Sequence, residues 1–417
     1  MGRSLQRVPW GYRNTHPEEF PHKCGECTKQ RRFKRPKDLA NHQRDKHGMR
    51  NYEPSVGNLI DQAYSMRIST TEPRSVPGSS SYINNPFSLG YGNSYQGQRS
   101  GTSSIKPDMF SWTRQTLMSN LQTKIEPTEQ YISMCNRSVD LLVQHLYKID
   151  NPTFIPREVV KGGSLGKGTA VKDKSDIDLV VYMGDDGIDG TIEEQREKAI
   201  AFLKIYIVSH SQCSFDGETQ AAVKVKLQVD LTHTVDVDIL PTFLCHDDRR
   251  QIYDDMKNDK RRRDTASAAL SPLQRDFVKH RPAKVKQLIR LVKYWKGTCL
   301  QEDPSKRLPT SYPLELITIG EWEDAGKPED FDMRKGFYHV MNAIKNYKNI
   351  HRVWYINYDM SRIARAGVLH GHYVIDPANP YNNVMDRCDA WDDVSRQVGT
   401  FLRQELFSGI SPSDGWK

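Results

Sequence analysis

The chain has 417 residues, of which 27% are charged and 37% hydrophobic, so it is long enough for two or three domains. No uninterrupted apolar stretch reaches the length of a membrane span, and the first residues lack the apolar segment of a secretory signal. Seven scattered cysteines favour reduced thiols over a disulfide framework. These features argue against a membrane or secreted protein and predict a cytoplasmic one, with the nucleus as a second compartment.

Most of the net charge of +8 lies near the N-terminus. Residues 21–50 carry ten Lys or Arg and three acidic residues, a net charge of +7, while residues 1–20 carry +1 and the remainder is neutral. Such an asymmetry indicates a basic module with a polyanionic partner, for example nucleic acid. A solvated basic surface with no partner is the alternative.

Residues 20–50 have the spacing of a C2H2 zinc finger, a small ββα fold. Two cysteines separated by two residues are followed, after fourteen residues, by two histidines separated by four, and Phe33 and Leu39 supply the small apolar core. A module this short folds through its metal, so zinc is expected as a structural ion. Its basic helix is expected to bind either nucleic acid or a protein. The predicted zinc ligands are Cys24, Cys27, His42 and His47.

Residues 51–108 are rich in Ser, Gly, Asn and Tyr and show no apolar periodicity, which predicts a disordered linker. From residue 109 the apolar pattern returns. The first clear element is a helix over 139–149.

A glycine-rich stretch at 161–168 resembles a phosphate-binding P-loop at first sight. A P-loop requires Ser or Thr directly after Gly-Lys, where the hydroxyl holds Mg²⁺. Here Gly166 and Lys167 are followed by Gly168, so the P-loop interpretation fails.

Three apolar segments that follow predict strands. Residues 179–183 form a short buried run, 223–231 alternate apolar and polar residues up to Leu231, and 235–240 repeat the alternation, as expected for neighbouring strands of one sheet. After residue 272 the periodicity is helical, with an apolar stripe over 285–295. The order predicts an α+β fold, with a mixed-sheet core over 109–270 and a helical domain over 271–411.

Two pairs of aspartates lie on the predicted strands. Asp176 and Asp178 are two residues apart, so their carboxylates point to one side of the sheet, and Asp236 and Asp238 form a second such pair. Carboxylates this close repel one another unless a cation lies between them, and Mg²⁺ prefers such oxygen ligands. The alternative is a set of solvated surface acids.

Six sequence blocks now become recognisable as a set, in the order VVKGGSLGKGT, SDIDLVVY, VDILPTF, LQRDFVKHRPAKVKQLIRLVKYW, YPLELITIGEWE and YVIDPANP. In this order they closely resemble the 2′-5′-oligoadenylate synthetases over roughly residues 139–407. The resemblance implies a polymerase-β-like nucleotidyltransferase core with a helical C-terminal half. It also implies an enzyme of innate antiviral immunity that double-stranded RNA activates and that joins ATP into 2′-5′-linked oligoadenylates with release of pyrophosphate. The zinc finger is not part of that family's usual architecture.

The resemblance also implies roles for individual residues. Asp176, Asp178 and Asp238 would be the catalytic residues and would hold Mg²⁺, two ions being expected, with Asp238 near the reacting 2′-hydroxyl. Nucleotide-binding residues would be Gly163, Ser164, Arg290, Lys293, Ser311, Tyr312 and Glu315. The RNA-binding residues would be Lys161, Lys167, Arg275, Lys279 and Lys284.

Two departures from the family pattern leave alternatives open. Ser311 stands where the family commonly has a glutamine that contacts the nucleotide, so strict selection of adenine does not follow. The C-terminal residues lack an element linked to oligomerisation in some members, so the oligomeric state does not follow either. A cyclic dinucleotide synthase resembling cyclic GMP–AMP synthase is the rival enzyme. The rival from another class is a nucleic-acid-binding zinc-finger protein with an inactive transferase domain.

Overall fold

A computed structural model describes residues 108–173, 176–184, 191–243, 249–258, 263 and 266–417, together with two short strands near the N-terminus. The chain divides into two units, Met1–Arg74 and Ser75–Lys417. In the first unit β1 (His22–Lys23) pairs antiparallel with β2 (Arg32–Phe33). The predicted zinc ligands Cys24, Cys27, His42 and His47 lie outside the described residues, as does the predicted linker up to residue 107.

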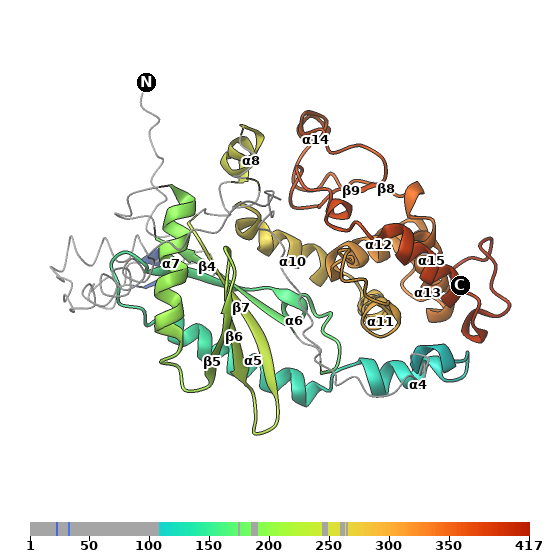
Figure 1. Cartoon of the computed structure of the whole chain (residues 1–417), viewed down its shortest axis with the longest axis horizontal. Coiled ribbons are helices and arrows are strands. Elements are labelled where there is room, and N and C mark those ends of the chain that lie inside the picture. The colour runs from blue at the N-terminus through green and yellow to red at the C-terminus, as the bar shows by residue number, and fades with distance from the viewer. Residues whose placement is uncertain are drawn as a thin grey trace, which may run out of the picture. The chain divides into compact units, whose positions relative to one another are not determined.

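A five-stranded mixed sheet forms the framework of the second unit, in the order β3-β4-β7-β6-β5 (Figure 1). Only β4 and β7 run parallel to each other; the other neighbours are antiparallel. Their side chains alternate between buried and accessible at the start of β7 and throughout β6, as the period of a strand requires. The strands are β3 (Pro156–Lys161), β4 (Asp176–Met183), β5 (Cys213–Glu218), β6 (Val223–Gln228) and β7 (Thr234–Thr242).

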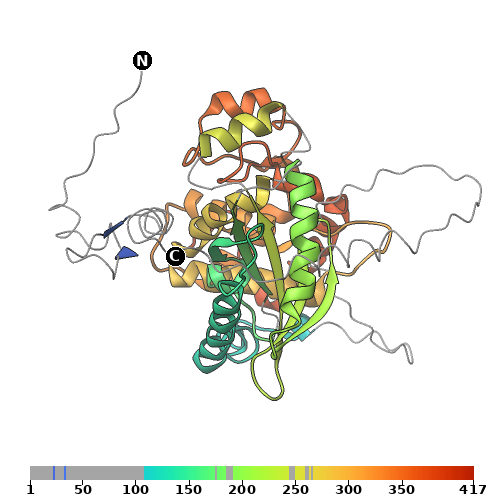
Figure 2. The same ribbon diagram turned by 90° about the vertical axis from the view of Figure 1, so that its left-hand side faces the viewer.

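Two long helices, α5 (Glu129–Leu146) and α7 (Ile192–Ile207), lie on the face of the sheet that is turned to the viewer in Figure 2. The start of α7 is fixed by a capping box in which Thr191 and Glu194 each bond the other's backbone N–H. The start of α5 is capped by Thr128, which accepts a bond from the N–H of Tyr131. The predicted helix over 139–149 is therefore longer at its start and ends at Leu146.

The C-terminal half is helical, and α12 (Ser311–Asp324) is its central element. Nine residues of α12 are buried, from Pro313 to Trp322, because α11 (Ala283–Cys299) and α13 (Met333–Lys345) both pack against it. The other helices are α8 (Arg249–Asn258), α10 (Ser271–Lys279), α11 (Ala283–Cys299), α13 (Met333–Lys345), α14 (Met360–Ala366) and α15 (Trp391–Phe401). Two parallel two-residue strands, β8 (His351–Arg352) and β9 (Tyr373–Val374), and short single turns connect them.

The segment that precedes the sheet packs into the helical half rather than onto the sheet. It comprises η1 (Asp108–Ser111), α4 (Leu117–Asn120) and η2 (Leu121–Ile125), and its buried side chains join the apolar core of α11, α12, α13 and α15. Trp112, for example, stacks on Tyr294 with ring centroids 5.7 Å apart. The sequence pattern assigned these residues to the sheet core over 109–270. Periodicity shows that one face of a helix is apolar, but it does not show which other element covers that face.

The predicted α+β fold, a mixed-sheet core followed by a helical C-terminal half, is confirmed, but one predicted strand is too long. β6 ends at Gln228, and Leu231 is fully exposed. The chain turns there because the Asp230 carboxylate accepts bonds from the backbone N–H groups of Thr232 and His233. No helix in the described part of the chain is both long and apolar enough to cross a bilayer.

Candidate active site

The glycine-rich stretch forms a tight turn between β3 and the short helix α6 (Gly163–Lys167). Gly163 has a φ of +65°, and a Cβ at this position would lie 2.6 Å from the Asp176 carbonyl oxygen and 2.9 Å from the Asp178 nitrogen. Any larger residue would therefore clash with the backbone of β4. The Gly162 N–H also donates to the Asp178 carbonyl at 2.6 Å, so the turn lies directly against the start of that strand.

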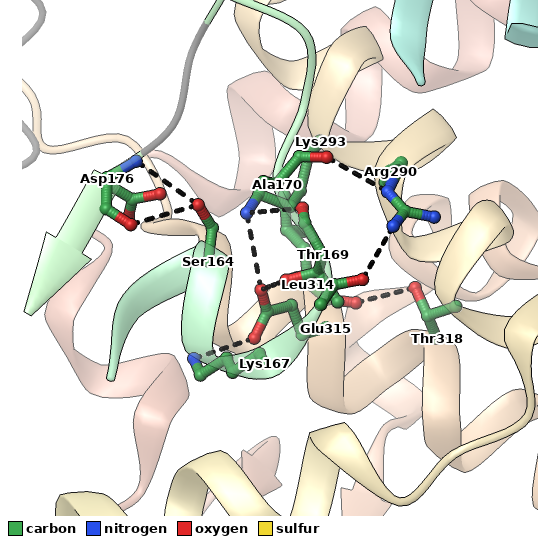
Figure 3. A network of polar contacts seen from close by, with 11 residues as sticks. Ser164, Lys167, Thr169, Ala170, Asp176, Arg290, Lys293, Leu314, Glu315 and Thr318 are labelled. Atoms are coloured by element: carbon green, nitrogen blue, oxygen red, sulfur yellow. Dashed lines mark hydrogen bonds and ion pairs between the residues drawn. The ribbon is translucent and has the colours of Figure 1, made fainter. Parts of the chain in front are cut away.

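Ser164 fixes the start of β4 to α6. Its side chain is 2% exposed, and the hydroxyl donates to the Asp176 carbonyl at 3.2 Å while accepting from the Asp176 N–H at 3.3 Å (Figure 3). The predicted contact of this hydroxyl with a triphosphate stays a prediction. In the structure, its bonds hold Asp176 in place.

The parallel pairing of β4 and β7 brings the two aspartate pairs together. Asp176 lies opposite Asp236 and Asp178 opposite Asp238 in the strand register. Asp236 is exposed, and its carboxylate bonds Lys226 at 2.9 Å, so its charge is already paired at the surface. Asp238 is partly buried. Of the second pair, Asp238 is therefore the residue available to act with Asp176 and Asp178.

Two of the three predicted catalytic carboxylates, Asp178 and Asp238, lie in an environment that disfavours their charge. Burial, followed by repulsion from Asp176 and Asp238, raises the pKa of Asp178 to about 7, against the opposing effects of Lys167 and a bond from the Gly163 N–H. Burial is also the main reason why the pKa of Asp238 is raised, with Lys224 opposing it. Excess negative charge of this kind at the edge of a cleft is the environment that a divalent cation neutralises.

The donor set fits Mg²⁺ in its chemistry, because all three side chains offer carboxylate oxygens. Over the described ranges of the chain, no three His, Cys, Asp or Glu side chains are already arranged to hold a metal ion. Substrate phosphates commonly supply part of the Mg²⁺ coordination in nucleotide-transferring enzymes, so a preformed all-protein cage is not required.

Lys167 and Glu315 form a largely buried ion pair, and their predicted contacts with RNA and with nucleotide stay predictions. Lys167, predicted to contact RNA, donates to Glu315 at 2.9 Å, and its ammonium lies 4.4 Å from the ring centroid of Tyr312. Burial alone would lower the pKa of Lys167, but Glu315 and then Asp178 and Asp176 raise it. Glu315, predicted to contact nucleotide, is 1% exposed and also accepts from the Thr169 hydroxyl at 3.1 Å. Its position is that of a buried counter-charge.

Arg290 and Lys293 of α11, predicted to bind phosphate, hold the loop that follows α6. Arg290 donates to the carbonyl oxygens of Gly168 at 2.8 Å and Ala170 at 3.0 Å, and Lys293 donates to that of Thr169 at 3.2 Å (Figure 3). The Lys293 ammonium also lies 3.5 Å from Glu315. These bonds fasten the sheet core to the helical half beside the aspartates.

A cleft opens between the sheet core and the helical half. It contains Gly163, Asp178 and Tyr312 from the predicted site, whereas Ser311, the first residue of α12, is absent from its lining. Sequence reasoning missed Gln274 and Asn382. The lining residues are Gly162, Gly163, Lys167, Asp178, Leu240, Ser267, Ser271, Gln274, Arg275, Thr310, Tyr312, Pro313, Asn382, Val384 and Arg387.

Beneath this cleft lies Asp376, which is fully buried. The Tyr312 hydroxyl donates to it at 3.0 Å, the Gln274 amide at 2.6 Å and the Asn382 amide at 3.2 Å. Burial raises the pKa of Asp376, against the opposing bonds from Ala378 and these side chains. The YVIDPANP block contains this residue, but nothing in the local sequence indicates that three cleft residues converge on it.

The remaining predicted RNA contacts are spread between the surface and the cleft. Lys161 pairs with Asp140 at 2.5 Å, Lys284 pairs with Asp330, and Lys279 is exposed. Arg275 donates to the Lys161 carbonyl at 3.3 Å and also lines the cleft. Lys279 and Lys284 are therefore the residues whose removal tests an RNA-binding surface without altering the cleft.

The mixed sheet, the α6 turn and the paired aspartates fit a nucleotidyltransferase domain. The sequence-family model of the nucleotidyltransferase domain matches residues 148–282. A second sequence-family model, described as 2′-5′-oligoadenylate synthetase 1, domain 2, C-terminus, matches residues 246–417. A mouse 2′-5′-oligoadenylate synthase 1A is 32% identical over 60% of this chain and 76% of its own length. The chain belongs to the 2′-5′-oligoadenylate synthase family.

Other relatives are longer than the matching region. Mouse 2′-5′-oligoadenylate synthase 3 is 29% identical over 66% of this chain but only 26% of its own length. A mouse 2′-5′-oligoadenylate synthase-like protein 2 is 32% identical over 62% of this chain and 56% of its own length. The chain thus spans about a quarter to about half of these two relatives.

Proposed function

We propose that this protein joins ATP into 2′-5′-linked oligoadenylates, with release of pyrophosphate, in response to double-stranded RNA. The observation that supports the proposal is the strand register, which places Asp178 of β4 opposite Asp238 of β7, with Asp176 two residues away and the α6 turn packed against the start of β4. Family membership supports the same activity. The role proposed for such an enzyme is innate antiviral defence in the cytoplasm.

In this proposal the chain's residues position the two nucleotides and move one proton. Asp238 accepts the proton of a 2′-hydroxyl, and that oxygen forms a bond to the α-phosphorus of the second ATP. The bond from this phosphorus to the bridging oxygen breaks, and pyrophosphate leaves. Asp176, Asp178 and Asp238 would hold Mg²⁺, which when bound neutralises charge that develops on the phosphates. Arg275 and Arg387 bring guanidinium groups to the same cleft, whereas the charge of Lys167 is balanced by Glu315.

The direct test is incubation of the purified protein with Mg²⁺ and all four nucleoside triphosphates, with and without double-stranded RNA. Mass spectrometry combined with a 2′-5′-specific phosphodiesterase should identify linear oligoadenylates that form only with RNA. A cyclic dinucleotide would instead support the rival enzyme. Absence of any nucleotide transfer under all these conditions would contradict the proposal and favour the nucleic-acid-binding alternative.

RNA activation is expected to depend on Lys279 and Lys284. The double variant Lys279→Glu with Lys284→Glu should raise the RNA concentration needed for half-maximal activity by about tenfold and weaken its salt dependence, because phosphate contacts are lost. Turnover at saturating RNA should change little. The control is the double variant Lys306→Glu with Lys348→Glu, which reverses the charge of two lysines that pair with Asp393 and Asp392 at the start of α15. Equal effects of the two double variants would show that only net charge matters.

The N-terminal residues are expected to affect RNA affinity rather than catalysis. Removal of residues 1–107 retains Asp108, whose carboxylate pairs with Lys124 at 2.8 Å, and should leave the maximal rate nearly unchanged. If the predicted zinc finger binds nucleic acid, the truncation raises the activation constant for RNA, and more so at low salt. Activation constants for both proteins at two salt concentrations measure this. Identical values would assign the finger to a protein partner, and a large loss of maximal rate would make it part of the active fold.

A further inference from the structure

The buried carboxylate of Asp376 fixes the orientation of two amide side chains in the cleft. Four donors converge on it: the amides of Gln274 and Asn382, the Tyr312 hydroxyl and, at 2.8 Å, the N–H of Ala378. These four bonds favour the ionised carboxylate, which can only accept hydrogen bonds, and oppose the burial that raises the pKa of Asp376.

An acceptor-only partner determines which end of each amide faces it. The NH₂ groups of Gln274 and Asn382 must point to Asp376, so their carbonyl oxygens are turned elsewhere. Both residues line the cleft, and no residue in the described part of the chain donates a hydrogen bond to either oxygen. Two cleft-lining side chains thus keep an oxygen that is not bonded within the described part of the chain, and Asp376 fixes which end of each amide is that oxygen.

The other polar groups of the cleft cannot provide the same selectivity. Lys167, Arg275 and Arg387 carry only donors and suit phosphates, and the hydroxyls of Ser267, Ser271 and Thr310 rotate to donate or accept. The Tyr312 hydroxyl is already bonded to Asp376, and Asp178 belongs to the catalytic carboxylates. Gln274 and Asn382 are the neutral side chains with fixed acceptor character.

We infer that Asp376 is a positioning residue for base selection, which holds Gln274 and Asn382 so that the cleft prefers a base with an exocyclic amino group. The inference rests on the proposed nucleotidyltransferase function. An amino group donates to both oxygens, whereas a base without one leaves them unpaired in a partly buried site, which is unfavourable. This arrangement supplies selectivity that Ser311 does not, since Ser311 does not line the cleft.

The test compares ATP with purine riboside triphosphate, which has the same shape but lacks the 6-amino group. Affinities are measured by calorimetry with the α,β-methylene analogues, which cannot release pyrophosphate, and kcat/KM with the hydrolysable forms. Wild-type protein should prefer the adenine compound by roughly tenfold in both measurements. Asp376→Asn should reduce this preference to near unity, because a carboxamide can donate as well as accept and no longer fixes either amide.

A matched control is available on the same segment. Asp386 is exposed and accepts from the Asn383 amide at 2.7 Å, but neither residue lines the cleft, so Asp386→Asn should keep the preference. If Asp376 has a purely structural role, Asp376→Asn should weaken the binding of both analogues equally and leave the ratio of their affinities unchanged. That result would overturn the inference. If Asp376→Asn does not fold, Gln274→Met removes one acceptor directly and should lower the same ratio.

The outcomes separate this inference from the proposed function. Equal affinity of the wild-type protein for both analogues overturns base selection by Asp376 even if oligoadenylates are made. If the wild-type protein prefers the adenine analogue and both Asp376→Asn and Gln274→Met abolish that preference, base selection by Asp376 is supported even when no oligomer forms. In that case the proposed transfer reaction is wrong. Failure of the wild-type protein to bind either nucleotide contradicts both.

Discussion

Replacing Asp178 by Asn is expected to lower nucleotide transfer by at least about a hundredfold, since a charged group that acts on the transferred phosphate is lost without a change in volume. The measurement is the rate of pyrophosphate release with Mg²⁺ and saturating double-stranded RNA. The control is Asp236→Asn on β7, an exposed aspartate that pairs with Lys226 and should retain activity. Wild-type turnover by Asp178→Asn would exclude the proposed site.

The same substitution should stabilise the metal-free protein at high pH. A carboxyl group whose pKa is raised to about 7 in the fold is favourable when protonated, and its contribution to stability is lost as the pH rises through that value. The amide mimics the protonated acid at every pH. The melting temperature of Asp178→Asn in EDTA should therefore exceed that of the wild type at pH 8, and the difference should shrink toward pH 4. A difference independent of pH would contradict this electrostatic account.

The second large effect is expected from Glu315→Gln. The change leaves Lys167 and Lys293 buried without their shared counter-charge, and breaking a buried ion pair in this way costs about 3 kcal/mol of unfolding free energy. Urea denaturation monitored by tryptophan fluorescence measures it. Adding Lys167→Met to the variant should recover part of the loss, because it removes one of the two unpaired charges.

The matched control is a carboxylate that pairs with two cations at the surface. Asp393 accepts from Lys306 and Arg396, both of which are well exposed, so Asp393→Asn should change stability little. Equal losses for Glu315→Gln and Asp393→Asn would mean that the burial of Glu315 is not what makes its charge important. A further loss on adding Lys167→Met would contradict the proposed role of unpaired charge.

The sequence was sufficient to predict three of the five strands (β4, β6 and β7), the paired aspartates and the helices α5 and α11, because each leaves a local pattern. The alternation in β6 and the two-residue spacing in Asp176 and Asp178 depend only on strand geometry. The choice between Asp236 and Asp238 was not local, since it depends on which residue Lys226 reaches from the neighbouring strand.

The interior of the site could not be predicted for the same reason. A lysine in a glycine-rich turn suggests an exposed cation, but Lys167 meets Glu315 from α12, a residue distant in sequence. Likewise, the role of Asp376 arises from three side chains on separate elements. Family resemblance carried over the positions of such residues but not the direction in which their side chains point.

The parallel pairing of β4 with β7 has a consequence for folding kinetics. Antiparallel neighbours such as β5, β6 and β7 can pair through short turns, whereas β4 and β7 are joined by a long connection that contains α7, β5 and β6. Contacts between segments so far apart in the chain form slowly, because a long loop must close before they stabilise anything. The aspartates that repel one another are thus brought together by one of the slower events of folding.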